Sequence, residues 1–176
     1  RLAASLREAR ALIVRTRTQV RGVLLESAAR LEVVGRLGVG LDNIDVRACE
    51  ARGIAVYPAT GANDLSVAEY VITAALMLLR RAWFATARVA AGEWPRTESM
   101  GRELAGKRLG LVGYGAIARV TGSMARDLGM SVGAYDPLLP EDHPAWAGAL
   151  RQALPDLLST SDVVSLHVPL TDATRA

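Results

Sequence analysis

The sequence predicts an α/β fold built on parallel sheets. Short apolar runs typical of buried strands alternate along the chain with segments that have the periodicity of helices. Such alternation favours parallel sheets, because each helix returns the chain to the same end of the sheet. A third observation is a glycine-rich turn at residues 113–115, which joins an apolar run directly to a helical segment. The chain has 176 residues, enough for one domain or two small ones.

The first part of the chain contains one series of strands and helices. Apolar runs predict three strands, at residues 11–14, 31–37 and 54–58. Helical spacing predicts two helices between them, at residues 18–30 and 46–52. Asp45 is a suitable N-cap for the second helix, and Gly53 is suited to end it.

A loop dense in turn residues, 58–64, is the predicted domain boundary. A long helix is predicted after it, from Leu65 to about Arg81, and the pattern leaves a continuation to Ala91 open. Apolar residues lie nearly all round this helix, so it must be covered on several sides. Burial within its own domain is one way to cover it.

A second series of strands and helices follows Gly106. Apolar runs predict three strands, at residues 108–112, 131–135 and 162–168. Helices are predicted at residues 116–128, where Gly129 ends the helix, and from about Pro155.

Composition argues against several classes of partner. The net charge is +3, the arginines are scattered among acids and aromatic residues make up only 5%, so no nucleic-acid partner is expected. The apolar run 67–79 is too short to span a membrane and contains Glu69. The single cysteine, Cys49, cannot form an internal disulfide, which suits a cytoplasmic protein. Neither His143 nor His167 has neighbours with metal-ligand spacing, so no metal site is expected.

The stretch LGLVGYGAIARV, residues 109–120, contains a Gly-x-Gly-x-x-Ala pattern at Gly113, Gly115 and Ala118. Between a strand and a helix, the first glycine permits a tight turn and the second leaves room for a pyrophosphate against the backbone. The third small residue lets the helix pack close to the strand. The pyrophosphate would lie on free N–H groups at the positive end of the helix dipole. Alone, the pattern is also compatible with a simple turn.

Asp136 strengthens the nucleotide interpretation, because it follows the next predicted strand, about 20 residues further on. A carboxylate there accepts hydrogen bonds from the ribose hydroxyls of adenosine and repels a 2′-phosphate. No Arg or Lys follows in residues 137–140, which favours NAD over NADP. The alternative is that Asp136 only caps the turn before Pro137.

Four segments resemble the D-isomer-specific 2-hydroxyacid dehydrogenases, the family that includes phosphoglycerate, D-lactate and glycerate dehydrogenases. They are distributed along most of the chain, at residues 33–61, 63–81, 101–120 and 161–175. The resemblance implies a Rossmann-type doubly wound parallel sheet plus part of a smaller flavodoxin-like α/β substrate domain. Residues 1–60 would be the partial substrate domain. Residues 61–176 would be a truncated NAD-binding domain that begins with the interdomain helix. The sequence does not begin with methionine, and we expect a piece lacking both ends.

The resemblance also implies a role for particular positions. Those facing the substrate would be Arg15, Thr16, Val39 and Gly40, with the backbone of the last two binding a carboxylate. The pyrophosphate would lie against Gly113, Gly115, Ala116 and Ile117, and the ribose against Asp136 and Pro137. The other side of the cofactor would be lined by His167, Val168, Pro169 and Thr174. Ala116 stands where many relatives carry arginine, so one phosphate or interdomain contact is expected to be absent.

The implied function is NAD-dependent interconversion of a small D-2-hydroxy acid and its 2-keto acid by hydride transfer. The catalytic arginine, glutamate and histidine of the family are expected beyond residue 176. His167 is expected beside the cofactor, not as the proton donor, and His143 as an exposed bystander. Two alternatives are an NAD-regulated, corepressor-like dimeric binding protein on the same fold and a formate dehydrogenase.

Partners follow from the same resemblance. The helical region 65–91 would build a homodimer interface, and the substrate would be a small anionic 2-hydroxy or 2-keto acid. A doubly charged acid would suit the arginines at positions 15, 17, 36 or 80, for which simple exposure to solvent is the alternative.

Overall fold

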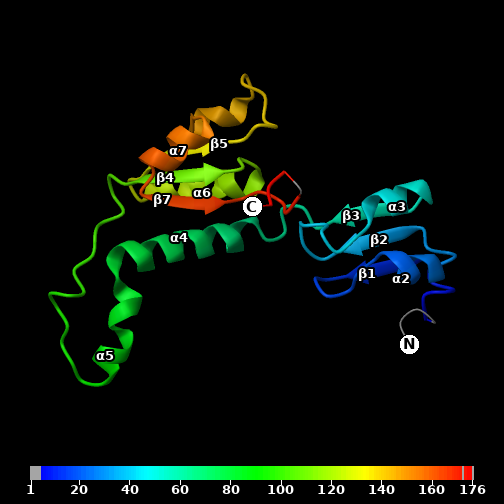
Figure 1. Cartoon of the computed structure of the whole chain (residues 1–176), viewed down its shortest axis with the longest axis horizontal. Coiled ribbons are helices and arrows are strands. Elements are labelled where there is room, and N and C mark those ends of the chain that lie inside the picture. The colour runs from blue at the N-terminus through cyan, green and yellow to red at the C-terminus, as the bar shows by residue number, and fades with distance from the viewer. Residues whose placement is uncertain (1–4, 172, 176) are drawn as a thin grey trace. The chain divides into compact units, whose positions relative to one another are not determined.

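The structure, a computed structural model, describes residues 5–171 and 173–175. The chain divides into two compact units: unit 1 is Arg1–Asn63 with Pro169–Ala176, and unit 2 is Asp64–Val168. Each unit contains its own parallel sheet and its own buried core (Figure 1). The predicted α/β class is confirmed.

Unit 1 holds a three-stranded parallel sheet of order β1-β2-β3. Its strands are β1 (Ala11–Val14), β2 (Val33–Arg36) and β3 (Ala55–Pro58), and its helices are α2 (Gly22–Ser27) and α3 (Val46–Ala51). Asp45 caps α3 as predicted, since its carboxylate accepts a hydrogen bond of 3.0 Å from the backbone N–H of Ala48.

The helix predicted over residues 18–30 is wrong in its first turn, because α2 begins only at Gly22. Val20 is instead extended and pairs with Ile44 in an isolated parallel bridge. Its N–H donates to the carbonyl of Asn43 at 2.8 Å, and its carbonyl accepts from the N–H of Asp45 at 3.0 Å. Val20 is fully buried, so tertiary pairing and burial override the local helical periodicity.

Unit 2 begins with α4 (Asp64–Arg80), the long helix predicted from Leu65. It ends because Arg81 adopts a left-handed conformation, with φ of 55°. The continuation to Ala91 is not one helix: a 3-10 turn, η1 (Ala82–Ala85), is followed by α5 (Thr86–Ala90). Figure 1 shows α5 turned away from the axis of α4.

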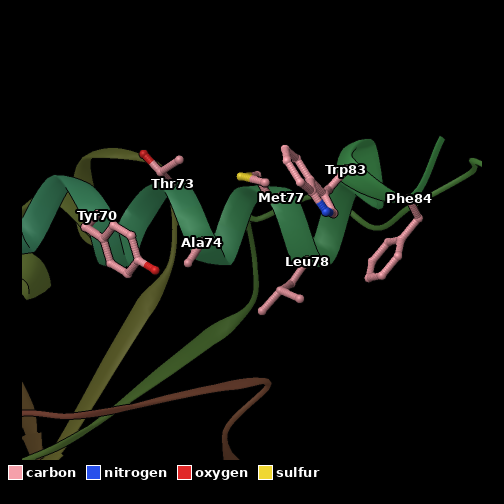
Figure 2. A pocket seen from close by; sticks show the side chains of 7 residues that line it. All are labelled: Tyr70, Thr73, Ala74, Met77, Leu78, Trp83 and Phe84. Carbon is pink, nitrogen blue, oxygen red and sulfur yellow. The ribbon is translucent and has the colours of Figure 1, made fainter. Parts of the chain in front are cut away.

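Residues 82–100, which we name the arm, carry large exposed apolar side chains. Together with the adjacent face of α4 they line an open groove with a volume of about 330 Å³ (Figure 2). The residues that line it are Tyr70, Thr73, Ala74, Met77, Leu78, Trp83 and Phe84. Trp83 and Phe84 are 65% and 62% exposed, far more than apolar residues of a core. The arm and α4 therefore present an apolar surface that unit 2 does not cover itself.

The sheet of unit 2 has four parallel strands in the order β6-β5-β4-β7. The strands are β4 (Arg108–Val112), β5 (Ser131–Tyr135), β6 (Leu150–Arg151) and β7 (Val163–Leu166). The remaining helices are α6 (Ala116–Asp127), the 3-10 turn η2 (Pro144–Gly148) and α7 (Leu154–Thr160). Strand β6 and turn η2 were not predicted, because a two-residue strand has no measurable alternation.

Helices cover both faces of this sheet, so it is doubly wound. Leu109 and Leu111 are fully buried in a core shared with α4 and α6. Gly110 and Gly133 lie opposite each other in register and support α7. A Cβ on Gly110 would lie 2.3 Å from Ser161 Oγ, and one on Gly133 would lie 3.0 Å from Leu157 Cδ1. Larger residues at either position would lift α7 away from the sheet.

Replacing Leu157 by Ala should lower the free energy of unfolding by about 2–5 kcal/mol, because this side chain is fully buried on the glycine pair. Leu158→Ala is the matched control: Leu158 is 50% exposed, so its loss should cost about 0.5 kcal/mol or less. Denaturant unfolding of the intact protein measures both. Equal losses would contradict this packing of α7.

Candidate functional site

The turn after β4 is formed by Gly113, Tyr114 and Gly115. Gly113 has φ of 86°, in the region that residues with a side chain rarely adopt. A Cβ at this position would lie 2.6 Å from the carbonyl oxygen of His167 and 2.9 Å from Val168 Cγ1. The absence of a side chain thus lets the turn lie directly against the end of β7.

Gly115 opens α6 and faces empty space. It is the N-cap of the helix, in an extended conformation, and no heavy atom lies within 4 Å of a Cβ built on it. No side chain of the described residues caps this helix end, and Ala116 is exposed. The amides of Ala116 and Ile117, in the first turn, are therefore available to an external acceptor. This end of α6 has the features of an anion-binding site.

Ala118 is fully buried in the core of unit 2. Its small side chain lies where the sequence pattern required close packing between helix and strand.

Asp136, directly after β5, ties two loops together. Its Oδ2 accepts a hydrogen bond of 2.8 Å from the N–H of Tyr114, and its Oδ1 accepts one of 2.9 Å from the N–H of Leu138. The second bond is the turn cap that was the alternative interpretation of this residue. A carboxylate has about four acceptor sites, so two remain for ribose hydroxyls. Pro137 beside it is exposed.

Tyr114 is almost fully buried, which the Gly-x-Gly pattern does not predict. Its ring stacks on that of Trp146 with centroids 5.3 Å apart, and the indole N–H of Trp146 donates to the carbonyl of Pro140 at 2.8 Å. The middle residue of the glycine turn therefore anchors the irregular segment after β5.

The end of β7 forms the second wall of this region. The N–H of His167 donates to the carbonyl of Val112 at 2.7 Å, which continues the pairing of β7 with β4. Its Nε2 lies 3.0 Å from Ser165 Oγ. Burial lowers the pKa of His167 below its ordinary value, so the ring is neutral at neutral pH. Alternation along the strand puts residues 165 and 167 on one face, and that signal could have revealed the pair.

Pro169 and Thr174 belong to unit 1, whereas the other predicted cofactor residues belong to unit 2. Thr174 Oγ1 donates to the carbonyl of Pro169 at 2.5 Å and accepts from the N–H of Thr171 at 2.8 Å. The Thr174 side chain thus joins Pro169 and Thr171.

The predicted substrate residues lie after two adjacent parallel strands of unit 1. Arg15 and Thr16 follow β1, Val39 and Gly40 follow β2, and all four are exposed. Within residues 5–171 and 173–175 no acceptor is found for the amides of Val39 and Gly40. Because the carboxyl ends of parallel strands meet at one edge, this edge presents free donors to a ligand.

Asn43 holds the two loops of this edge together. It is 1% exposed, and its Nδ2 donates to the carbonyls of Arg15 and Thr18, each at 2.8 Å. The sequence analysis did not identify this residue, because an asparagine in a loop carries no pattern that reports which carbonyls it reaches.

The four arginines considered for a doubly charged substrate differ in burial. Arg15, Arg17 and Arg80 are exposed, whereas Arg36 is only 8% exposed.

Two further findings concern metals and membranes. The described part of the chain contains no group of three or more His, Cys, Asp or Glu residues that could hold a metal ion. Among the described residues, no helix has the length and apolar character needed to cross a membrane.

Replacing Asn43 by Ala should lower the free energy of unfolding by about 1–3 kcal/mol, since the buried amide of Asn43 no longer donates to the carbonyls of Arg15 and Thr18. It should also increase trypsin cleavage after Arg15 and Arg17. Gln19→Ala, at an exposed position of the same loop, is the control. Unchanged cleavage in the Asn43 variant would show that this side chain does not hold the loop.

Residues 72–176 match the family model described as "D-isomer specific 2-hydroxyacid dehydrogenase, NAD binding domain". Among curated proteins, the chain is 56% identical over 167 residues to the (S)-sulfolactate dehydrogenase of Chromohalobacter salexigens, covering 94% of this chain and 54% of that protein. It is 40% identical over 171 residues to the D-3-phosphoglycerate dehydrogenase of Methanocaldococcus jannaschii, covering 97% of this chain and 33% of that protein. The chain thus spans about half or less of the length of these relatives.

Among solved structures, the fold is similar to D-lactate dehydrogenase from Aquifex aeolicus complexed with NAD and lactic acid. The TM-score is 0.89 at 31% identity, with 98% of this chain and 52% of that chain covered. The similarity extends over both compact units.

Proposed function

The chain belongs to the D-isomer-specific 2-hydroxyacid dehydrogenases, with a Rossmann-type NAD-binding domain, and from this premise we propose the activity of the intact protein. It is an NAD-dependent oxidoreductase that interconverts a small D-2-hydroxy acid and its 2-keto acid. The observation that carries the proposal is the open N-terminus of α6 beside a glycine turn that Asp136 holds by a hydrogen bond to Tyr114.

The residues of unit 2 suit a dinucleotide. The space beside Gly115, where a Cβ would meet nothing within 4 Å, admits a pyrophosphate to the amides of Ala116 and Ile117. Asp136 would accept hydrogen bonds from the adenosine ribose, with Pro137 beside it. We assign the other side of the cofactor to His167, Val168, Pro169 and Thr174. Bound NAD supplies the hydride chemistry, and the chain's own part is to bind and orient it.

The residues of unit 1 suit the acid. The free amides of Val39 and Gly40 would bind the substrate carboxylate, with Arg15 and Thr16 facing the substrate. Two relatives are named for hydroxy acids that carry a sulfonate or a phosphate besides the carboxylate, which supports a substrate with two acidic groups. We assign the proton transfer to the arginine, glutamate and histidine that the family resemblance expects beyond residue 176.

The place of His167 beside the glycine turn, where its carbonyl oxygen would lie 2.6 Å from a Cβ on Gly113, supports its assignment to the cofactor instead of the proton transfer. We propose a cytoplasmic location, which suits a chain whose one cysteine, Cys49, is buried.

Reduction of a panel of 2-keto acids by the intact protein with NADH tests the activity. We expect turnover of pyruvate derivatives with an acidic group at C3, measured by the loss of NADH absorbance. If the protein binds NADH but neither reduces any keto acid nor oxidises formate, the result would favour the NAD-regulated binding protein. Oxidation of formate alone would favour a formate dehydrogenase.

Replacing Asp136 by Asn should reduce the preference for NADH over NADPH on the order of tenfold, because the charge that repels a 2′-phosphate is removed. Asp136→Ala should erase the preference and also lower the melting temperature, since it loses both hydrogen bonds to the loops. Calorimetric affinities for both nucleotides measure the ratio. Asp127→Asn, an exposed carboxylate at the end of α6, is the control. An unchanged affinity ratio in both Asp136 variants would rule out the ribose assignment.

We propose that the intact protein is a homodimer through the helical region 65–91. The support is the apolar groove of Figure 2, in which the arm continues the exposed face of α4. Arg88 braces the arm through Glu93 and Glu98, at 2.6 and 2.5 Å, so this surface has a defined shape. Large exposed side chains in the arm also include Val89, Trp94 and Met100.

Trp83→Glu should raise the dimer dissociation constant by about 100-fold or more, because a charge would be buried without a partner. Sedimentation equilibrium of the intact protein at micromolar concentration measures it. Leu138→Glu, at a position 91% exposed in the loop after β5, should leave the association unchanged. A monomeric wild-type protein at these concentrations would refute the dimer.

A further inference from the structure

Trp146, in the 3-10 turn η2, links the glycine turn to the far end of the loop that follows β5. Its ring stacks on that of Tyr114, with centroids 5.3 Å apart and 15° between the ring planes. Its indole N–H donates to the carbonyl of Pro140 at 2.8 Å. The loop begins at Asp136, whose Oδ2 accepts from the N–H of Tyr114 at 2.8 Å. Residues 136–140 are therefore tied to Tyr114 at their first residue, through its main chain, and at their last, through its ring and Trp146.

Further contacts hold the stacked rings. Arg151 Cζ lies 5.9 Å from the ring centroid of Trp146, a cation–π arrangement, and Arg151 Nη1 pairs with Glu141 at 2.6 Å. A Cβ on Gly148 would lie 2.9 Å from the hydroxyl of Tyr114, so the end of η2 passes close to this ring. Trp146 is half-buried and packs against the core of unit 2. The stack is thus continuous with the core.

The loop of residues 136–140 lies outside the sheet, because β5 ends at Tyr135. Two of its five residues are prolines, Pro137 and Pro140, which have no N–H to donate. Inside the loop, the N–H of Leu138 donates to Asp136 Oδ1 at 2.9 Å. The position of the loop therefore depends strongly on the contacts at its two ends.

We infer that Trp146 is a positioning residue for the adenosine half of NAD. Asp136, proposed above to bind the adenosine ribose, begins the loop whose other end Trp146 holds. A loop that is ordered before binding costs less free energy on association than one that the cofactor must order. Trp146 acts through the loop, without a contact of its own to the cofactor. This inference rests on the ribose assignment proposed above and adds a residue to it.

Calorimetric affinities of the intact protein for NADH and for ADP-ribose, which lacks the nicotinamide, test the inference. Trp146→Ala should weaken both by about tenfold, because part of the loop would then have to be ordered on binding. Trp146→Phe keeps an aromatic ring beside Tyr114 but loses the N–H that Pro140 accepts, so its loss should be smaller, about threefold. Leu158→Ala, which removes a half-exposed side chain of α7, is the control and should leave both affinities unchanged.

Turnover separates positioning of the adenosine half from a general structural defect. With a 2-keto acid that the wild type reduces, kcat of Trp146→Ala at saturating NADH should stay within about twofold of the wild type, because the adenosine half takes no part in hydride transfer. The KM for NADH should rise with the loss of affinity.

Equal affinities for ADP-ribose in the wild type and in Trp146→Ala overturn the inference. A loss for NADH that ADP-ribose does not share also overturns it, since the effect would then lie at the nicotinamide half. A fall in kcat at saturating NADH without a loss of affinity overturns it as well. Should Trp146→Ala not fold, Trp146→Phe carries the same comparison.

Binding of ADP-ribose is measured without turnover, so the inference and the proposed activity can fail separately. If the wild type reduces no keto acid while Trp146→Ala still binds ADP-ribose more weakly than the wild type, the activity fails and the role of Trp146 stands. If the wild type reduces a keto acid and the Trp146 variants bind ADP-ribose as it does, the activity stands and the inference fails.

Discussion

The hydrogen bond from the N–H of Tyr114 to the carboxylate of Asp136 joins the ends of two neighbouring strands, and the shape of the nucleotide site depends on it. It fixes the glycine turn against the end of β5, while Gly113 lies against the carbonyl of His167 on the other side. The turn is thus held from both sides, by the Asp136 side chain after β5 and by close approach to the main chain of His167 after β7. These contacts set the position of the first turn of α6 and the direction of its free amides.

In unit 1 a side chain also joins two loops, but it donates hydrogen bonds where Asp136 accepts them. Asn43 donates from one amide nitrogen to the carbonyls of Arg15 and Thr18, whereas Asp136 accepts from two amides. Asn43 supplies donors to loop carbonyls, and Asp136 supplies acceptors to loop amides. Because Asn43 is buried, loss of its hydrogen bonds would cost more stability than loss of exposed ones. In both units a single polar side chain arranges the loops at the carboxyl edge of a parallel sheet, which is where ligands of such sheets bind.

The sequence predicted the features that follow from local chemistry. Strand 108–112 was predicted with its bounds, and the long helix was predicted to end at about Arg81, where α4 ends at Arg80, because apolar runs and periodicity are properties of neighbouring residues. It failed at residues 18–21, where Val20 pairs with Ile44 far along the chain. The sequence also could not show that Arg36 is buried while the other arginines are exposed. The burial of Arg36 depends on the space left by Gly38 and on the shape of the turn, and hydrophobic periodicity reports neither.

The two edges differ in charge, and the difference suits two kinds of ligand. Ala116 is uncharged, so a diphosphate at the start of α6 would be held by neutral amides and the helix dipole. Binding without a cation suits a cofactor that has to dissociate from the site after each reaction. At the edge of unit 1, Asn43 joins the loops without adding a charge. An aspartate in that role would bring its own negative charge to this edge. Since the tie there is an amide, it adds no negative charge beside the free N–H groups of Val39 and Gly40.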